Sequence, residues 1–289
     1  MSVDVAFEGK PHDLGGNFNV CRVLPNLARR MVGPFVFFDQ MGPVQMAPDH
    51  GLDVRPHIGL ATVTYLFDGE VLHRDSLGSE QLIRSGELNW MTAGRGITHS
   101  ERSSPAARRA GARLHGLQLW AALPDSHEET EPSFHHYNEE SLPQVERPGV
   151  RLRVIAGSAC GVESPSRVYS PLFFVEAHVD KGATLSLPEE HAQRAAYVVS
   201  GIVEAEGDSG NESHGSSTML AFNREGAATL VAREPAHVML LGGAPVGERH
   251  LFWNFVSSSK TRLKKAKADW QNDRFAHVPG DHERIPLAD

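Results

Sequence analysis

Short apolar segments, separated by Gly, Pro and polar residues, make up most of the chain. From residue 61 the segments ATVTYLF, VLHRDS, EQLIR and LNWMTA are rich in β-branched and aromatic residues, which favour strands. They predict four antiparallel strands. The Asp68-Gly69 pair between the first two predicts a hairpin turn, because Gly accepts a positive φ. The segment LHGLQLWAAL at 114–123 predicts a further strand.

Short apolar segments of the same kind resume after a polar stretch at 124–149. Segments such as RAAYVVSGIVEAEG and AHVMLLGGAP follow one another at a spacing of about 8 to 12 residues, as in sandwiches and barrels. Ser200-Gly201 stands in the same context as Asp68-Gly69, which suggests a duplicated fold. We therefore expect an all-β protein with a first barrel at residues 1–130, a linker at 131–148 and a second barrel at 149–289.

Only the tail predicts a helix. In SSSKTRLKKAKADWQ a run of Ser can cap the first turn, and Leu263, Ala266 and Trp270 fall on one face.

Composition removes several classes of protein. The net charge of −8 disfavours binding to nucleic acid or to an anionic membrane surface. The apolar runs are shorter than the roughly 20 residues of a membrane span, and the first residues lack a signal pattern, so we expect a cytoplasmic protein. Because the chain has 16 His but only 2 Cys, a metal site would use imidazole and carboxylate ligands.

The segment TAGRGITHSER contains two candidate metal ligands. Its His99 and Glu101 are two residues apart, so both side chains project from the same face of an extended strand. His57 lies upstream at the start of an apolar strand. Two His and one carboxylate suit a non-haem iron with open positions. An H-x-E pair alone is also common on exposed strands that bind nothing.

Longer runs resemble the pirin family. They are RRMVGPFVFFDQMGP, IGLATVTYLFDGEVLHRDSLGS, GELNWMTAGRGITHSER, LHGLQLW and FWNFVSSSKTRLKKAKADW, and the likeness extends from near residue 20 to residue 280. The resemblance implies a bicupin, two stacked antiparallel β-barrels, with one iron in the N-terminal barrel held by a His-x-His and a His-x-Glu motif. His99 and Glu101 match the second motif. The second barrel has no H-x-H or H-x-E pair, so we expect it to be structural and without ligands.

The first motif departs from the family. Bacterial pirins typically read R-P-H-P-H-I-G-L, whereas this chain reads R-P-H-I-G-L at 55–60. His57 then takes the second ligand position and Arg55 the first. Arginine has no lone pair to offer a metal. Three outcomes stay open: iron held by His57, His99 and Glu101 with Arg55 turned to solvent or paired with an acid, His50 as a substitute ligand, or no metal, with Arg55 paired to Glu101.

The resemblance implies two functions. One is an iron-dependent dioxygenase of the quercetin 2,3-dioxygenase type, acting on a flavonol or another flat aromatic. The other is a non-catalytic protein that responds to redox state or metal and regulates a transcription factor or a metabolic enzyme. We expect His73 and His115 to be satisfied histidines of the barrel rather than ligands.

Overall fold

The computed structural model describes residues 3–14, 18–45, 51–111, 113–206, 212–222 and 227–287. The chain divides into two compact units. The first combines Met1–His12, Cys21–Phe38 and Glu140–Pro245, and the second combines Asp13–Val20, Asp39–Glu139 and Val246–Asp289. Both are built of curled antiparallel sheets, so the all-β fold class is confirmed. Among the described residues, no helix is long and apolar enough to cross a membrane.

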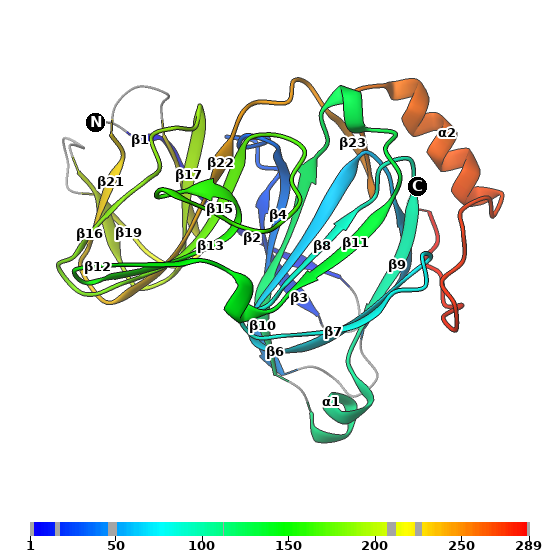
Figure 1. Cartoon of the computed structure of the whole chain (residues 1–289), viewed down its shortest axis with the longest axis horizontal. Helices are drawn as coiled ribbons and strands as arrows, with labels where there is room; N and C mark the ends of the chain where they lie inside the picture. The colour runs from blue at the N-terminus through cyan, green and yellow to red at the C-terminus, as the bar shows by residue number, and fades with distance from the viewer. Residues whose placement is uncertain are drawn as a thin grey trace. The chain divides into compact units, whose positions relative to one another are not determined.

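Two antiparallel sheets contain the strands of residues 140–245 (Figure 1). Their strands are β1 (Val3–Glu8), β12 (Gln144–Arg147), β13 (Val150–Ala159), β14 (Val162–Glu163), β15 (Leu172–Val179), β16 (Thr184–Ser186), β17 (Gln193–Ser200), β18 (Val203–Ala205), β19 (Ser213–His214), β20 (Thr218–Phe222), β21 (Thr229–Ala232) and β22 (Ala236–Gly243). The larger sheet runs β1-β20-β17-β22-β15-β13-β12, with β14 paired to β13, and the smaller runs β16-β21-β18-β19.

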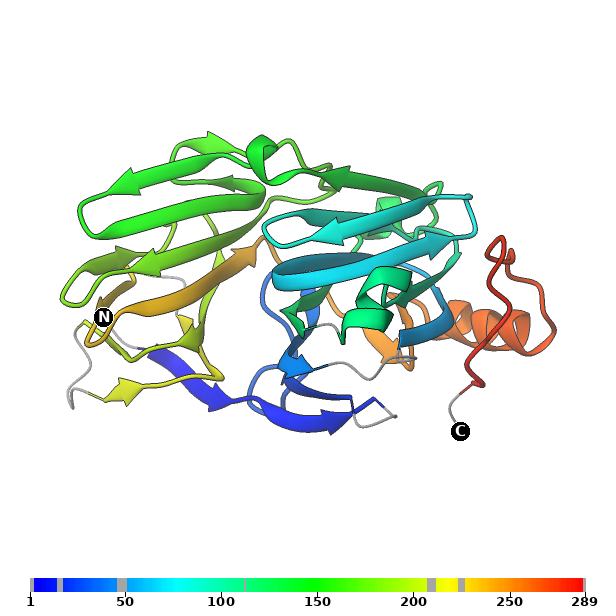
Figure 2. The same cartoon turned by 90° about the horizontal axis from the view of Figure 1, so that it is seen from below.

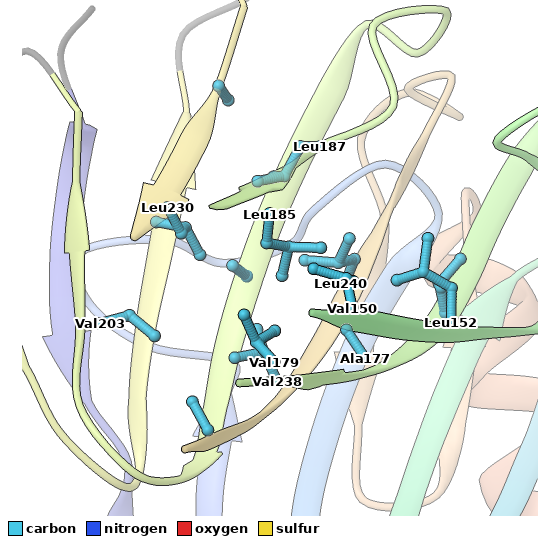
Figure 3. Packing of buried hydrophobic residues seen from close by; sticks show 14 of the residues in the cluster. Val150, Leu152, Ala177, Val179, Leu185, Leu187, Val203, Leu230, Val238 and Leu240 are labelled. Carbon is cyan, nitrogen blue, oxygen red and sulfur yellow. The ribbon is translucent and has the colours of Figure 1, made fainter. Parts of the chain in front are cut away.

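Alternation along these strands builds the core of the first unit. Val175, Ala177 and Val179 of β15 point to one side and pack with Val238 and Leu240 of the neighbouring β22. Figure 3 shows Ala177, Val179, Val238 and Leu240 among the aliphatic side chains gathered between the strands. Because the cluster consists of apolar side chains, its burial stabilises the unit without leaving polar groups unpaired.

A ten-stranded sheet forms most of the second unit. Its strands are β2 (Lys10–Asp13), β3 (Asn19–Leu24), β4 (Phe35–Gln45), β5 (Gly51–His57), β6 (Leu60–Asp75), β7 (Glu80–Arg84), β8 (Leu88–Thr92), β9 (Ile97–Arg102), β10 (Arg113–Ala122) and β11 (Ser133–Tyr137). The main path is β11-β8-β6-β10-β4-β3-β2, while β7 pairs with β6 and β9 pairs with both β5 and β6. A two-stranded sheet joins β23 (His250–Phe252) to β24 (Phe255–Ser257).

The expected hairpin at Asp68-Gly69 is wrong. Both residues lie inside β6, a single strand of 16 residues, so the four expected strands are three. Gly69 has φ of +91°, and the register with β10 shifts two residues before it, where Phe67 has no partner between Leu66 and Asp68. Gly69 therefore adopts the positive φ that its sequence context predicted, but within a continuous strand and not in a turn. The first part of β6 pairs with β8 and β10, and the part from Glu70 onward pairs with β7 and β9.

The expected tail helix is confirmed as α2 (Lys260–Gln271). The Ser259 side chain accepts a hydrogen bond from the Arg262 backbone N–H, and the buried residues are Leu263, Ala266 and Trp270. Figure 2 shows this helix in orange, near the C-terminus. A second helix, α1 (Pro105–Ala110), was not expected, because six residues are too few to set up a periodic pattern.

The polar stretch at 124–149 carries more regular structure than a plain linker. It contains the 3₁₀ turns η1 (Asp125–His127) and η2 (Glu139–Ser141), and the strands β11 and β12. One of the boundaries between the two units falls in this stretch, between residues 139 and 140.

Candidate metal centre

Three neighbouring strands, β5, β9 and the second half of β6, place the candidate residues on one face. In the register of these strands Arg55 lies across from His99 on one side, and Asp75 lies across from His99 on the other. His73 lies across from Glu101. Cross-strand partners share a face of a sheet, so the two-residue spacing of His99 and Glu101 brings all five side chains together. All five are buried.

His57 joins this cluster from the end of β5. Its Nε2 lies 3.1 Å from Nε2 of His99. Its Nδ1 lies 2.9 Å from the Asn254 carbonyl oxygen, which can only accept, so Nδ1 carries the proton and Nε2 presents a lone pair toward His99. Two nitrogen ligands about 2.1 Å from one ion and at right angles lie about 3 Å apart, close to the separation found here.

Both histidines are neutral near pH 7. Burial lowers the pKa of His57 to about 3, aided by the charge of Arg55 and opposed by the hydrogen bond to Asn254. Burial and the same guanidinium hold the pKa of His99 well below its usual range. Neutral imidazole is the form that binds a metal.

Arg55 is turned to Glu101 and not to solvent. Nη2 of Arg55 donates a hydrogen bond to Oε2 of Glu101, and the two side chains are only 9% and 7% exposed. Oε1 of Glu101 lies 3.0 Å from the Thr64 hydroxyl, which is also 3.0 Å from Oε1 of Gln118. The guanidinium therefore stands where a metal would compete for the carboxylate.

His73 is the residue that sequence reasoning undervalued. Its Nε2 lies 3.1 Å from Oδ2 of Asp75, and its ring stacks on Phe134 at 4.3 Å, as expected of a satisfied barrel histidine. Yet His73, His99 and Glu101 each offer one ligand atom, all within 4.8 Å of one another. The H-x-D spacing in LHRDS, two residues apart on one strand, was the available signal.

Three residues in and beside this cluster have polar side-chain atoms without a partner. Among the described residues, His99 Nδ1, Gln118 Nε2 and Arg55 Nη1 are buried without a hydrogen-bond partner. Such groups are rare in a folded interior unless a ligand or water completes them. Two neutral imidazoles and one carboxylate are a donor set that suits a divalent metal of the iron type, and Arg55 competes with it. The group whose ligand atoms all lie within 4.8 Å of one another contains His73, His99 and Glu101, whereas His57 approaches this group through His99. The alternative ligand, His50, lies outside the described residues.

Comparison with known proteins agrees with this architecture. Residues 17–121 match the pirin family and residues 174–276 match the pirin C-terminal cupin domain. A pirin-like protein of Caulobacter vibrioides is 50% identical, over 99% of both chains. A Pseudomonas aeruginosa protein named provisionally as a quercetin 2,3-dioxygenase is 39% identical, over 90% of this chain and 81% of that one.

A solved structure extends the comparison to the whole fold. The crystal structure of a quercetin 2,3-dioxygenase from Acinetobacter baumannii superposes with a TM-score of 0.87 at 30% identity, covering 99% of this chain and 94% of the other. The bicupin architecture expected from the sequence is thereby confirmed. The chain belongs to the pirin family.

Proposed function

We propose that this pirin is a metal-dependent oxygenase of the quercetin 2,3-dioxygenase type, with iron held by His57, His99 and Glu101 and a flavonol or a similar flat aromatic as substrate. The observation that carries the proposal is the pair of facing Nε2 atoms of the two histidines, 3.1 Å apart and buried beside a carboxylate. The names of two relatives, both given as quercetin 2,3-dioxygenases, support the substrate class.

The chain's own groups prepare this site. The Asn254 carbonyl fixes the tautomer of His57 and leaves its Nε2 free to bind. The Trp120 ring meets His57 edge-on at 5.1 Å, and Phe134 stacks on His73, so aromatic faces border the donor atoms. Bound iron supplies charge stabilisation and a template for both reactants.

Arg55 sets the affinity of the site for iron. A cation that binds Glu101 meets the guanidinium at the same carboxylate, and Arg55 replaces the fourth ligand of the family. Iron binding therefore requires the ion pair to loosen or Glu101 to bind through Oε1, which faces Thr64. We expect weaker iron binding than in a pirin with both histidines of the first motif.

Oxygen uptake with quercetin tests the activity. The wild type, Arg55→His and His99→Ala are compared under matched Fe(II) loading, with His277→Ala as the control because that histidine is exposed and lies outside the cluster. The register of β5 on β9 places residue 55 across from His99, so a substitution restores an imidazole there without an insertion. We expect turnover in the wild type, higher turnover in Arg55→His, and none in His99→Ala.

The Arg55–Glu101 ion pair favours a second candidate, a non-catalytic regulatory binding protein. The buried guanidinium pairs with Glu101, the carboxylate that a catalytic metal would need, as expected in a chain that does not catalyse a reaction. If neither the iron-loaded wild type nor iron-loaded Arg55→His consumes oxygen with quercetin, the oxygenase proposal is wrong and the regulatory role is favoured. Turnover in His99→Ala equal to the wild type would show that the reaction does not depend on this site.

A further inference from the structure

We infer that Glu176, His178 and His237 form a second metal site, on the face of the eight-stranded sheet opposite its aliphatic core, which binds zinc or a similar divalent cation. Glu176 and His178 are two residues apart on β15, and His237 of β22 lies directly across from His178. Val175, Ala177 and Val179 of the same strand point into the aliphatic core of Figure 3. Strand alternation therefore sends the three candidate ligands to the opposite face.

The distances between the donor atoms suit one ion. Oε1 of Glu176 lies 3.0 Å from Nε2 of His237 and 3.6 Å from Nε2 of His178. The ligand atoms all lie within 4.8 Å of one another, and the two imidazole rings stack at 4.4 Å. Ligands about 2.05 Å from a tetrahedral zinc lie about 3.3 Å apart, so small rotations of the side chains suffice to close the site.

The donor set leaves one position open. Two imidazoles and one carboxylate are a ligand set of zinc sites whose fourth position is taken by water or substrate. The His178 side chain is 45% exposed, whereas those of Glu176 and His237 are 9% and 13% exposed. An ion can thus enter from the side of His178 and be held by the two deeper ligands. On binding, it replaces the proton that His237 Nε2 donates to the carboxylate.

Two arginines of β13 border the site and limit its affinity. Arg153 lies across from Glu176 and donates to Oε2 at 3.4 Å, which leaves Oε1 to the ion and orients the carboxylate. Arg151 lies across from His178 and is exposed, so its charge is screened by solvent. These positive charges lower the affinity of the site for a cation.

The site lies in a different unit from the His57–His99 pair and does not rest on the proposed function. A search for H-x-H or H-x-E motifs misses it for two reasons. The order here is E-x-H, and the third ligand comes from another strand.

Zinc binding by the full chain tests the inference. Equilibrium dialysis with Zn²⁺ alone is carried out on His99→Ala, which lacks a ligand of the first site, and on its combinations with Glu176→Gln, His178→Ala and His237→Ala. His12→Ala, which removes an exposed histidine of the same unit, is the control for non-specific binding. We expect about one equivalent in the His99→Ala parent and in the control, and at least a tenfold loss of affinity in each of the other three.

Melting temperatures and Co²⁺ absorption spectra distinguish the loss of a ligand from misfolding. The three variants should keep the melting temperature of the parent without metal, and only the parent should show the visible absorption of tetrahedral Co²⁺. The inference is overturned if the His99→Ala parent binds no zinc. It is also overturned if the three substitutions leave the affinity unchanged, or if His12→Ala lowers it as much as they do.

Discussion

Removing the guanidinium of Arg55 should destabilise the metal-free protein strongly. In Arg55→Leu the carboxylate of Glu101, whose side chain is 7% exposed, loses its ion-pair partner and, of the described residues, keeps only the Thr64 hydroxyl within hydrogen-bond distance. Breaking a buried pair by removing one partner costs about 3 to 5 kcal/mol, because it leaves an uncompensated charge. For a chain of this size a loss of 3 kcal/mol corresponds to a fall of about 6 to 12 °C in melting temperature.

A double-mutant cycle isolates this interaction. Urea unfolding at pH 8 with a chelator present is measured for Arg55→Leu, Glu101→Gln and the double variant. Because the double variant leaves no buried charge, its loss should be smaller than the sum of the single losses by at least about 2 kcal/mol. Arg113→Leu is the matched control, since Arg113 pairs with Asp68 at the surface and its loss should cost about 0.5 kcal/mol or less. A cost for Arg55→Leu as small as that of the control would refute the reasoning.

Three further substitutions test other parts of the account. His99→Ala should abolish Fe(II) binding while His73→Ala preserves it, and equal loss of bound iron in both would place His73 among the ligands. Gly69→Ala should destabilise by about 2 kcal/mol or more in urea unfolding, because φ is +91° and a Cβ would lie 2.0 Å from a carbonyl oxygen of β10; an unchanged midpoint would contradict this backbone conformation and the close approach of β10. Burial raises the pKa of Asp281, but hydrogen bonds from Arg102 and Ser100 and the charge of Arg102 together outweigh burial and hold that pKa below its usual 3.8. The stabilisation is therefore present above that pH and is lost as the pH falls through the folded-state pKa, so Asp281→Asn should cost about 2 kcal/mol at pH 7 and much less at pH 2.

The sequence predicted the elements whose pattern is local. The tail helix follows from Leu263, Ala266 and Trp270 on one face, and the shared face of His99 and Glu101 follows from strand alternation. Gly69 was read as part of a turn, because a positive φ is compatible with a turn and with an irregular strand, and only the pairing partners distinguish them.

Long-range pairing determined the rest of the site. The contact of His57 with the Asn254 carbonyl joins residues 197 positions apart, and the position of His73 across from Glu101 depends on the register of β6. The sequence left three outcomes open for the metal site and gave no basis for choosing among them. The ion pair with Glu101 follows from the burial of both groups on facing strands.

The central claim is that His57, His99 and Glu101 retain a metal and that Arg55 weakens its binding. Anaerobic Fe(II) titration of the metal-free wild type and of Arg55→His tests it most directly. We predict about one equivalent in each, with a dissociation constant at least about tenfold lower in Arg55→His, because the substitution adds a ligand and removes a positive charge. Equal dissociation constants, or no binding by the wild type, would contradict the account.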